Sequence, residues 1–167
     1  MGSLPNQVQA SYLAHRTDPL FHLSPKTDDQ DLNHTGTLMK PYLVTEVTAP
    51  DLTAIQRTQP SPLSQPVSSP VAAGIGSMML QVTQNPAGTG YATAGPPAVG
   101  SLQIAAKTGT AQNGINNTNL NDAVFTCYAP YSNPQIAVAV IVQGGGYGAA
   151  AAAPIAVRII QAYLGKT

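Results

Sequence analysis

The segment Ala105–Ala111, with the sequence AAKTGTA, is the stretch around which the rest of the chain is organised. Lys107 is the only charged residue between Arg57 and Asp122, so a single ammonium group lies in a run of small, apolar and hydroxylated residues. A charged side chain in such a strand needs a partner or a ligand, because an unpaired buried charge is costly. The alternative is a lysine at the end of a surface strand with its charged head in water. The residues around this segment decide between a lysine that has a partner or ligand and a lysine that is only solvated.

Composition indicates one domain with little surface charge. The chain has 167 residues, of which 8% are charged, against roughly a quarter in average proteins. We therefore expect a surface covered mainly by Ser, Thr, Asn and Gln. Seven basic and seven acidic residues cancel, and no basic stripe with interleaved aromatic residues exists, so we expect no nucleic-acid partner.

The cysteine and histidine content predicts neither a disulfide nor a metal site. Cys127 is the only cysteine, and its surroundings favour a small core residue in a strand over a nucleophile. The histidines, His15, His22 and His34, lack the pairing at helical distance that metal ligands show. All three fall within residues 1–35, which also hold six of the fourteen charged residues and show no sustained periodicity. That segment is predicted to be disordered.

From Gly36 onward the sequence predicts ordered elements. Residues 37–48 end in alternating apolar and polar residues, which is typical of a short edge strand. Residues 49–66 contain four prolines and have the composition of a linker with no core of its own. A helix over 70–83 is predicted to begin at a serine N-cap with proline in its first turn, and its apolar residues recur every three or four positions.

Three strands and a second helix are predicted in the C-terminal half. The strands cover residues 101–112, 123–129 and 136–142, and the last has no polar position. A strand that is apolar on both faces is typical of a sheet covered on both sides. The helix over 149–164 can cover one face, whereas the shorter helix over 70–83 can cover only part of the other. We therefore expect a covering layer to be missing.

Residues 36–167 contain no histidine, so no Ser-His-Asp triad can be assembled there. Lys107 is followed by Thr-Gly-Thr, and Lys-Thr-Gly on a strand is the third element of serine acyl-transferases that use Ser-x-x-Lys, Ser-x-Asn and Lys-Thr-Gly. Four further segments match one group of these enzymes in order and spacing. The five are Gly36–Val44 (GTLMKPYLV), Asn85–Ala92 (NPAGTGYA), Lys107–Gln112 (KTGTAQ), Val124–Pro134 (VFTCYAPYSNP) and Gln135–Gly148 (QIAVAVIVQGGGYG). Together they resemble the C-terminal part of the class B penicillin-binding proteins, which are peptidoglycan D,D-transpeptidases.

The resemblance implies an α+β fold, part of the serine β-lactamase and penicillin-binding transpeptidase fold, with an antiparallel sheet and a C-terminal helix packed on one face. Lys107 would be the third-motif lysine that holds substrate electrostatically. The hydroxyls of Thr108 and Thr110 would bind the carboxylate of a peptidoglycan stem peptide or a β-lactam. The backbone N–H of Thr110 would be an oxyanion-hole donor, and Gly109 would let substrate lie along the strand edge. No metal or cofactor is implied.

The first two motifs of that family are absent. No serine lies three residues before a lysine, and none lies two residues before an asparagine. The segments TLMK at 37–40 and YSN at 131–133 only mimic them. Without the serine nucleophile the chain is expected to be inactive alone. Two alternatives remain open: a non-catalytic module that binds D-alanyl peptides or β-lactams, and an inert remnant whose exposed sheet face aggregates.

The resemblance also divides the chain. Residues 36–167 are interpreted as the C-terminal part of a transpeptidase domain, and residues 1–35 as an atypical segment that is disordered or frame-disrupted, with a frame disruption or an artificial junction upstream of Gly36. The family acts at the outer face of the plasma membrane. This chain has no apolar run of membrane-spanning length and no export signal, so an anchor would have to lie on upstream sequence. The missing N-terminal part of the domain is a further expected partner.

Overall fold

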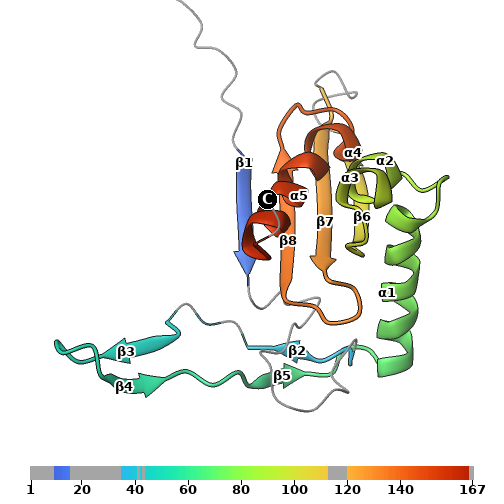
Figure 1. Cartoon of the computed structure of the whole chain (residues 1–167). Coiled ribbons are helices and arrows are strands. Elements are labelled where there is room, and N and C mark those ends of the chain that lie inside the picture. The colour runs from blue at the N-terminus through green and yellow to red at the C-terminus, as the bar shows by residue number, and fades with distance from the viewer. Residues whose placement is uncertain (1–9, 16–34, 41, 43, 113–119, 166–167) are drawn as a thin grey trace, which may run out of the picture.

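The computed structural model describes residues 10–15, 35–40, 42, 44–112 and 120–165, with the backbone alone for residues 10–15. Its centre is a four-stranded antiparallel sheet (Figure 1). The strands lie in the order β1 (Ala10–His15), β8 (Ile136–Val142), β7 (Asp122–Ala129) and β6 (Ala105–Ala111). The strand that carries Lys107, β6, is therefore one of the two edge strands of the described sheet.

One face of the sheet is covered by the C-terminal helix. Alternate residues of β7 and β8 pack against α5 (Ala153–Tyr163), with Phe125, Val140 and Ile160 fully buried between the layers. The helix predicted over 149–164 is confirmed, but it is divided into α4 (Gly148–Ala151) and α5. The predicted α+β fold with a helix on one sheet face is therefore confirmed.

The helix α1 (Ser69–Gln84) lies beside β6 and covers part of the opposite face. Met79 packs there against buried residues of three strands, Ala105, Tyr128 and Ala137. Near the end of the helix, the single proton of the buried Thr83 hydroxyl is shared between the carbonyl oxygens of Leu80 and Ile104, at 3.2 and 2.5 Å. These contacts fix the position of α1 relative to the start of β6.

Beyond α1 the same face is open in the described part of the chain. Ile141 is 50% exposed and Ala139 is exposed, although both lie in the central strand β8. On the neighbouring strand Val124 and Thr126 are only partly buried. The apolar residues on both sides of β8 led us to expect a covering layer that this chain does not supply. The exposed Ile141 agrees with that expectation.

A slender arm, made of β2 to β5, projects away from the sheet (Figure 1). It consists of two ribbons: β2 (Leu38–Met39) pairs with β5 (Pro62–Ser64), and β3 (Glu46–Thr48) pairs with β4 (Ala54–Arg57). The strand predicted over 37–48 is thus split in two, and the predicted linker at 49–66 contains β4 and β5. Every residue of β3, β4 and β5 is exposed, so the expectation that this region has no core of its own agrees with the structure.

Three further differences concern the ends of predicted elements. The strand predicted over 101–112 begins only at Ala105, and two short helices not predicted from sequence, α2 (Tyr91–Ala94) and α3 (Pro96–Val99), precede it. Residues 10–15 form β1, although regular structure was not expected in residues 1–35. The remainder of residues 1–34 lies outside the described residues. No sequence signal for β1 was found because its strand character depends on pairing with β8.

Candidate active site

The backbone groups of β6 alternate between its neighbour and the open edge of the sheet. The carbonyl of Gln103 accepts a hydrogen bond from the N–H of Tyr131, on the β7 side, at 2.9 Å. The next carbonyl, that of Ile104, accepts one from the hydroxyl of Thr83 on the α1 side, at 2.5 Å. Since successive peptide groups of a strand point in opposite directions, the even-numbered residues of β6 direct N–H and C=O away from β7.

The open edge therefore presents the backbone of Thr108 and Thr110. The side chains of β6 alternate between the two faces of the sheet. Lys107, paired with Thr126, lies on the open face, whereas Thr110, paired with buried Ala123, lies on the α5 face. Thr108 is partly buried and its hydroxyl reaches the strand edge, where it meets Thr89. Of the residues singled out from sequence, Lys107 and Thr108 line one pocket, and the backbone of Thr110 faces the same edge of the sheet.

Two glycines allow close packing at this part of the strand. A Cβ on Gly109 would lie 3.2 Å from the Cβ of Val124 on the open face. On the other face Gly148, at the start of α4, lies so close that its Cβ would be 2.1 Å from the carbonyl oxygen of Val124 and 2.6 Å from that of Gly109. The start of α4 therefore packs directly against the backbone of β6, on the face opposite the open one. Gly109 has a packing role in addition to the substrate role predicted for it.

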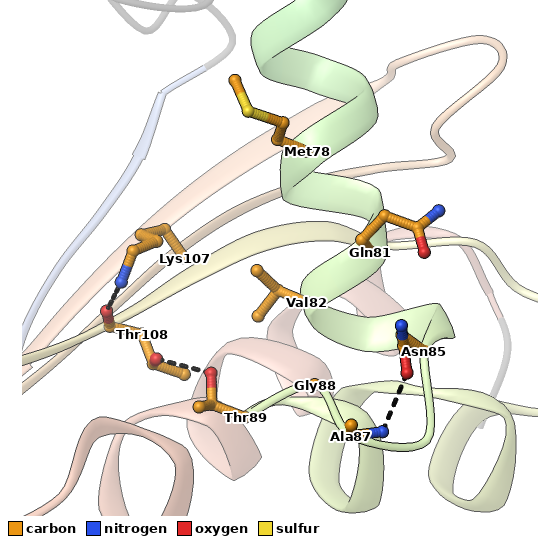
Figure 2. A pocket seen from close by; sticks show the side chains of 9 residues that line it. All are labelled: Met78, Gln81, Val82, Asn85, Ala87, Gly88, Thr89, Lys107 and Thr108. Carbon is orange, nitrogen blue, oxygen red and sulfur yellow. Dashed lines mark hydrogen bonds between the residues drawn. The ribbon is translucent and has the colours of Figure 1, made fainter.

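A pocket of about 360 Å³ opens between α1 and the outer edge of β6 (Figure 2). Met78 and Val82 of α1 give it an apolar wall, and Gln81 of the same helix lies at its side. Lys107 and Thr108 form the opposite wall, and the ammonium group of Lys107 donates a hydrogen bond to the carbonyl oxygen of Thr108. The pocket thus combines one cation and a hydroxyl with a small apolar surface.

Thr89 completes the polar side of the pocket and was not identified from sequence. Its hydroxyl lies 2.8 Å from that of Thr108 (Figure 2). Thr89 belongs to the turn after α1, which lies within the segment Asn85–Ala92 that carries part of the family resemblance. No spacing rule connects it with Thr108, because the two approach each other only through the packing of α1 against β6.

Electrostatically, the pocket favours an anion. The only ion pair in which both residues are described is that of Glu46 with Arg57, in the arm at 3.5 Å. The ammonium of Lys107 thus has no carboxylate counterpart among these residues, and it is exposed. A carboxylate or phosphate group of a ligand would supply the opposite charge.

The described residues give little support for a reactive thiol, a metal site or a membrane-spanning helix. Burial raises the pKa of the Cys127 thiol far above its usual value, so no thiolate forms at neutral pH, and the side chain is fully enclosed in the core as predicted. No cluster of three or more metal-ligating side chains occurs in the part of the chain that the structure covers. Among its helices, none combines the length and the apolar character needed to span a lipid bilayer.

The family model of the penicillin-binding protein transpeptidase domain matches residues 30–161. This chain belongs to that family. The peptidoglycan D,D-transpeptidase PbpA of Mycolicibacterium smegmatis is 38% identical over 138 residues, which are 77% of this chain but 26% of that protein. The chain therefore spans about a quarter of the length of this curated relative.

Solved structures agree with this assignment. The D,D-transpeptidase domain of a peptidoglycan glycosyltransferase from Eggerthella lenta superposes with a TM-score of 0.65 at 31% identity, covering 80% of this chain and 29% of that one. Penicillin-binding protein A of Mycobacterium tuberculosis, solved as a penicillin G acyl-enzyme complex, gives a TM-score of 0.63 at 34% identity, covering 78% of this chain and 28% of that one. The resemblance inferred from five sequence segments is thus confirmed.

Proposed function

We propose that this chain is the ligand-binding, C-terminal part of a peptidoglycan D,D-transpeptidase domain. Lys107 and the Thr108 hydroxyl bind the carboxylate of a D-alanyl stem peptide or of a β-lactam. The observation that carries the proposal is an ammonium without a carboxylate partner in the described chain, beside a hydroxyl, on the outer strand of the sheet. The apolar wall formed by Met78 and Val82 suits the small side chain of an alanyl group.

The rest of the edge fits a peptide that adds to the sheet. The N–H of Thr110 faces outward and would donate to the oxyanion that forms when the ligand carbonyl is attacked. Gly109 leaves the open face of β6 without a side chain, so an extended ligand can approach the strand. In an intact domain a serine hydroxyl would attack the carbonyl of the D-Ala-D-Ala bond, D-alanine would leave, and an amine would then accept the acyl group.

This chain alone would stop at binding. Its sequence contains neither Ser-x-x-Lys nor Ser-x-Asn, so the acylation step has no nucleophile and no base. Penicillin-binding protein A of Mycobacterium tuberculosis forms an acyl-enzyme with penicillin G. By contrast, we expect reversible binding here, unless the N-terminal part of a transpeptidase domain is supplied as a partner. An intact protein would work at the outer face of the plasma membrane, attached through upstream sequence.

The division of the chain belongs to the same proposal. Residues 36–167 are the transpeptidase part, and a frame disruption or an artificial junction upstream of Gly36 accounts for residues 1–35. The family resemblance implies an alanine-rich helix before the segment that begins at Gly36. Reading the coding DNA upstream of Gly36 in its other two frames tests the interpretation, because a frame disruption leaves that helix in one of them. Its absence from both frames would contradict the interpretation.

The binding proposal is tested by titrating the full 167-residue chain, labelled with ¹⁵N, with penicillin G and with a D-Ala-D-Ala peptide. We expect saturable shifts of the β6 amides, and a loss of affinity of about ten- to a hundredfold in Lys107→Ala, since bonds to a charged group are the stronger ones. Covalent labelling by a fluorescent penicillin would contradict the proposed lack of acylation.

A second candidate, the inert remnant, is favoured by one observation, the half-exposed Ile141 on the open sheet face. A face of this kind promotes aggregation when nothing covers it. An unfolded circular dichroism spectrum, or loss of monomer at micromolar concentration, would support the remnant over the binding module.

A further inference from the structure

Thr89 and Thr108 share one hydrogen bond at the edge of the pocket. Their hydroxyl oxygens lie 2.8 Å apart, which is a normal distance for an O–H···O bond. Each hydroxyl has a single proton, and either oxygen can be the donor. One of the two protons is used in the shared bond, so the direction of that bond decides which hydroxyl still has a proton to donate.

The two directions differ in what they offer to an anion. If Thr108 donates to Thr89, it presents only lone pairs to the pocket, and these repel a carboxylate. If Thr89 donates to Thr108, the proton of Thr108 remains available to the ligand, next to the ammonium of Lys107. A chain of hydrogen bonds in one direction is also cooperative, because each bond polarises the next. A carboxylate bound by Lys107 and the Thr108 hydroxyl therefore selects the direction in which Thr89 is the donor.

The turn that carries Thr89 is fixed on both sides by backbone hydrogen bonds. The N–H of Gly88 donates to the carbonyl of Asn85 at 2.7 Å, and the N–H of Gly90 donates to the carbonyl of Val82 at 3.0 Å. Close packing requires a glycine before Thr89, since a Cβ at Gly88 would lie 2.3 Å from the Val82 carbonyl oxygen. The backbone that carries Thr89 is thus fixed before any ligand arrives, which lowers the ordering cost of binding.

We propose that Thr89 is a positioning residue for carboxylate binding: it donates to the Thr108 hydroxyl and so keeps the Thr108 proton directed at the ligand carboxylate. This inference rests on the proposed function of Lys107 and Thr108. It adds the turn after α1 to a site that the sequence placed on β6 alone. Ligand recognition then depends on the packing of α1 against the sheet, which holds the two hydroxyls together.

Affinity for penicillin G, measured by NMR titration of the full chain, tests the inference. Thr89→Val keeps the shape and removes the hydroxyl, and it should weaken binding about three- to tenfold, the effect of one hydrogen bond. Thr89→Ser keeps the hydroxyl and should restore wild-type affinity. Thr93→Val is the matched control, because the Thr93 hydroxyl lies four positions along and is buried without a hydrogen-bond partner. Thr93→Val should bind like the wild type, and the unfolding midpoint of Thr89→Val should not change.

Each outcome separates this inference from the proposed function. If Thr89→Val binds as the wild type does while Lys107→Ala loses affinity, the role of Thr89 is overturned and the function of Lys107 stands. The role is also overturned if Thr89→Ser is as weak as Thr89→Val, or if the loss in Thr89→Val accompanies a lower unfolding midpoint. If the wild-type chain does not bind penicillin G, or Lys107→Ala binds equally well, the proposed function fails and the role of Thr89 fails with it.

Discussion

The sheet and the arm are both made of antiparallel strands, but they are stabilised in different ways. In β7 and β8 alternate side chains are fully buried against α5. In β3, β4 and β5 every side chain is exposed, and the contacts that define the outer ribbon are local: the pair of Arg57 with Glu46, and Asp51, which accepts hydrogen bonds from the N–H and hydroxyl of Thr53. Stability, and with it the geometry of the site, should therefore depend on the sheet and hardly on the arm.

Removing a large core side chain should have the largest effect. Phe125 lies fully buried in β7, and Phe125→Ala should lower the free energy of unfolding by about 3–5 kcal/mol through lost burial and a cavity. Ile55→Ala, in the arm, is the matched change because Ile55 is 68% exposed, and it should alter stability by less than about 0.5 kcal/mol. Urea denaturation of both variants checks this. Equal effects would show that the arm is not independent of the core.

Glycine substitutions compare a packed position with an open one. Gly148→Ala places a Cβ 2.1 Å from a backbone oxygen of β7, and the resulting displacement should cost about 1–3 kcal/mol. Gly74→Ala, in α1, has no atom within 4 Å of its new Cβ and should gain about 0.5–1 kcal/mol from helix propensity. Thermal unfolding distinguishes them. A neutral Gly148→Ala would contradict the close packing of α4 behind β6.

Two threonines at the end of α1 and in α2 provide a comparison of hydrogen bonding. Thr83→Val removes a buried hydroxyl with two backbone acceptors and should destabilise by about 1–3 kcal/mol. Thr93→Val removes a buried hydroxyl without a partner and should be neutral or stabilise by up to about 1 kcal/mol. Chemical denaturation measures both. The opposite order would mean that Thr83 does not anchor α1 to β6.

The ion pair of the arm should have the smallest effect. Arg57 and Glu46 lie 3.5 Å apart on a solvent-exposed ribbon, where such pairs are screened and contribute little. Arg57→Ala should change the unfolding midpoint and the affinity for penicillin G by amounts close to the error of either measurement. A clear loss of affinity in this variant would show that the arm contributes to the site.

Sequence reasoning succeeded where burial produces a pattern. The helices with apolar stripes were predicted closely, because residues that pack in a core repeat with the period of a helix. The strand at 136–142 was predicted from an uninterrupted apolar run. Lys107 was identified by its isolation and by its motif. The exposed face around Ile141 was also anticipated, since the apolar face of β8 has no matching helix in the sequence.

The same reasoning failed where structure depends on pairing between distant segments. The strands β4 and β5 bury no side chain, so they leave no pattern in a region that has the composition of a linker. The strand β1 exists through its pairing with β8, and Thr89 joins the pocket through the packing of α1.

The central claim is that β6 provides the binding half of a transpeptidase site without the covalent half. The most direct measurement is a ¹⁵N NMR titration of the full chain with penicillin G, followed by exchange into ligand-free buffer. The amide signals of Thr108 and Thr110 should shift saturably and then return to their starting positions. Signals that never shift would contradict binding at β6. Shifts that persist after the ligand is removed would show that the chain forms an acyl-enzyme after all.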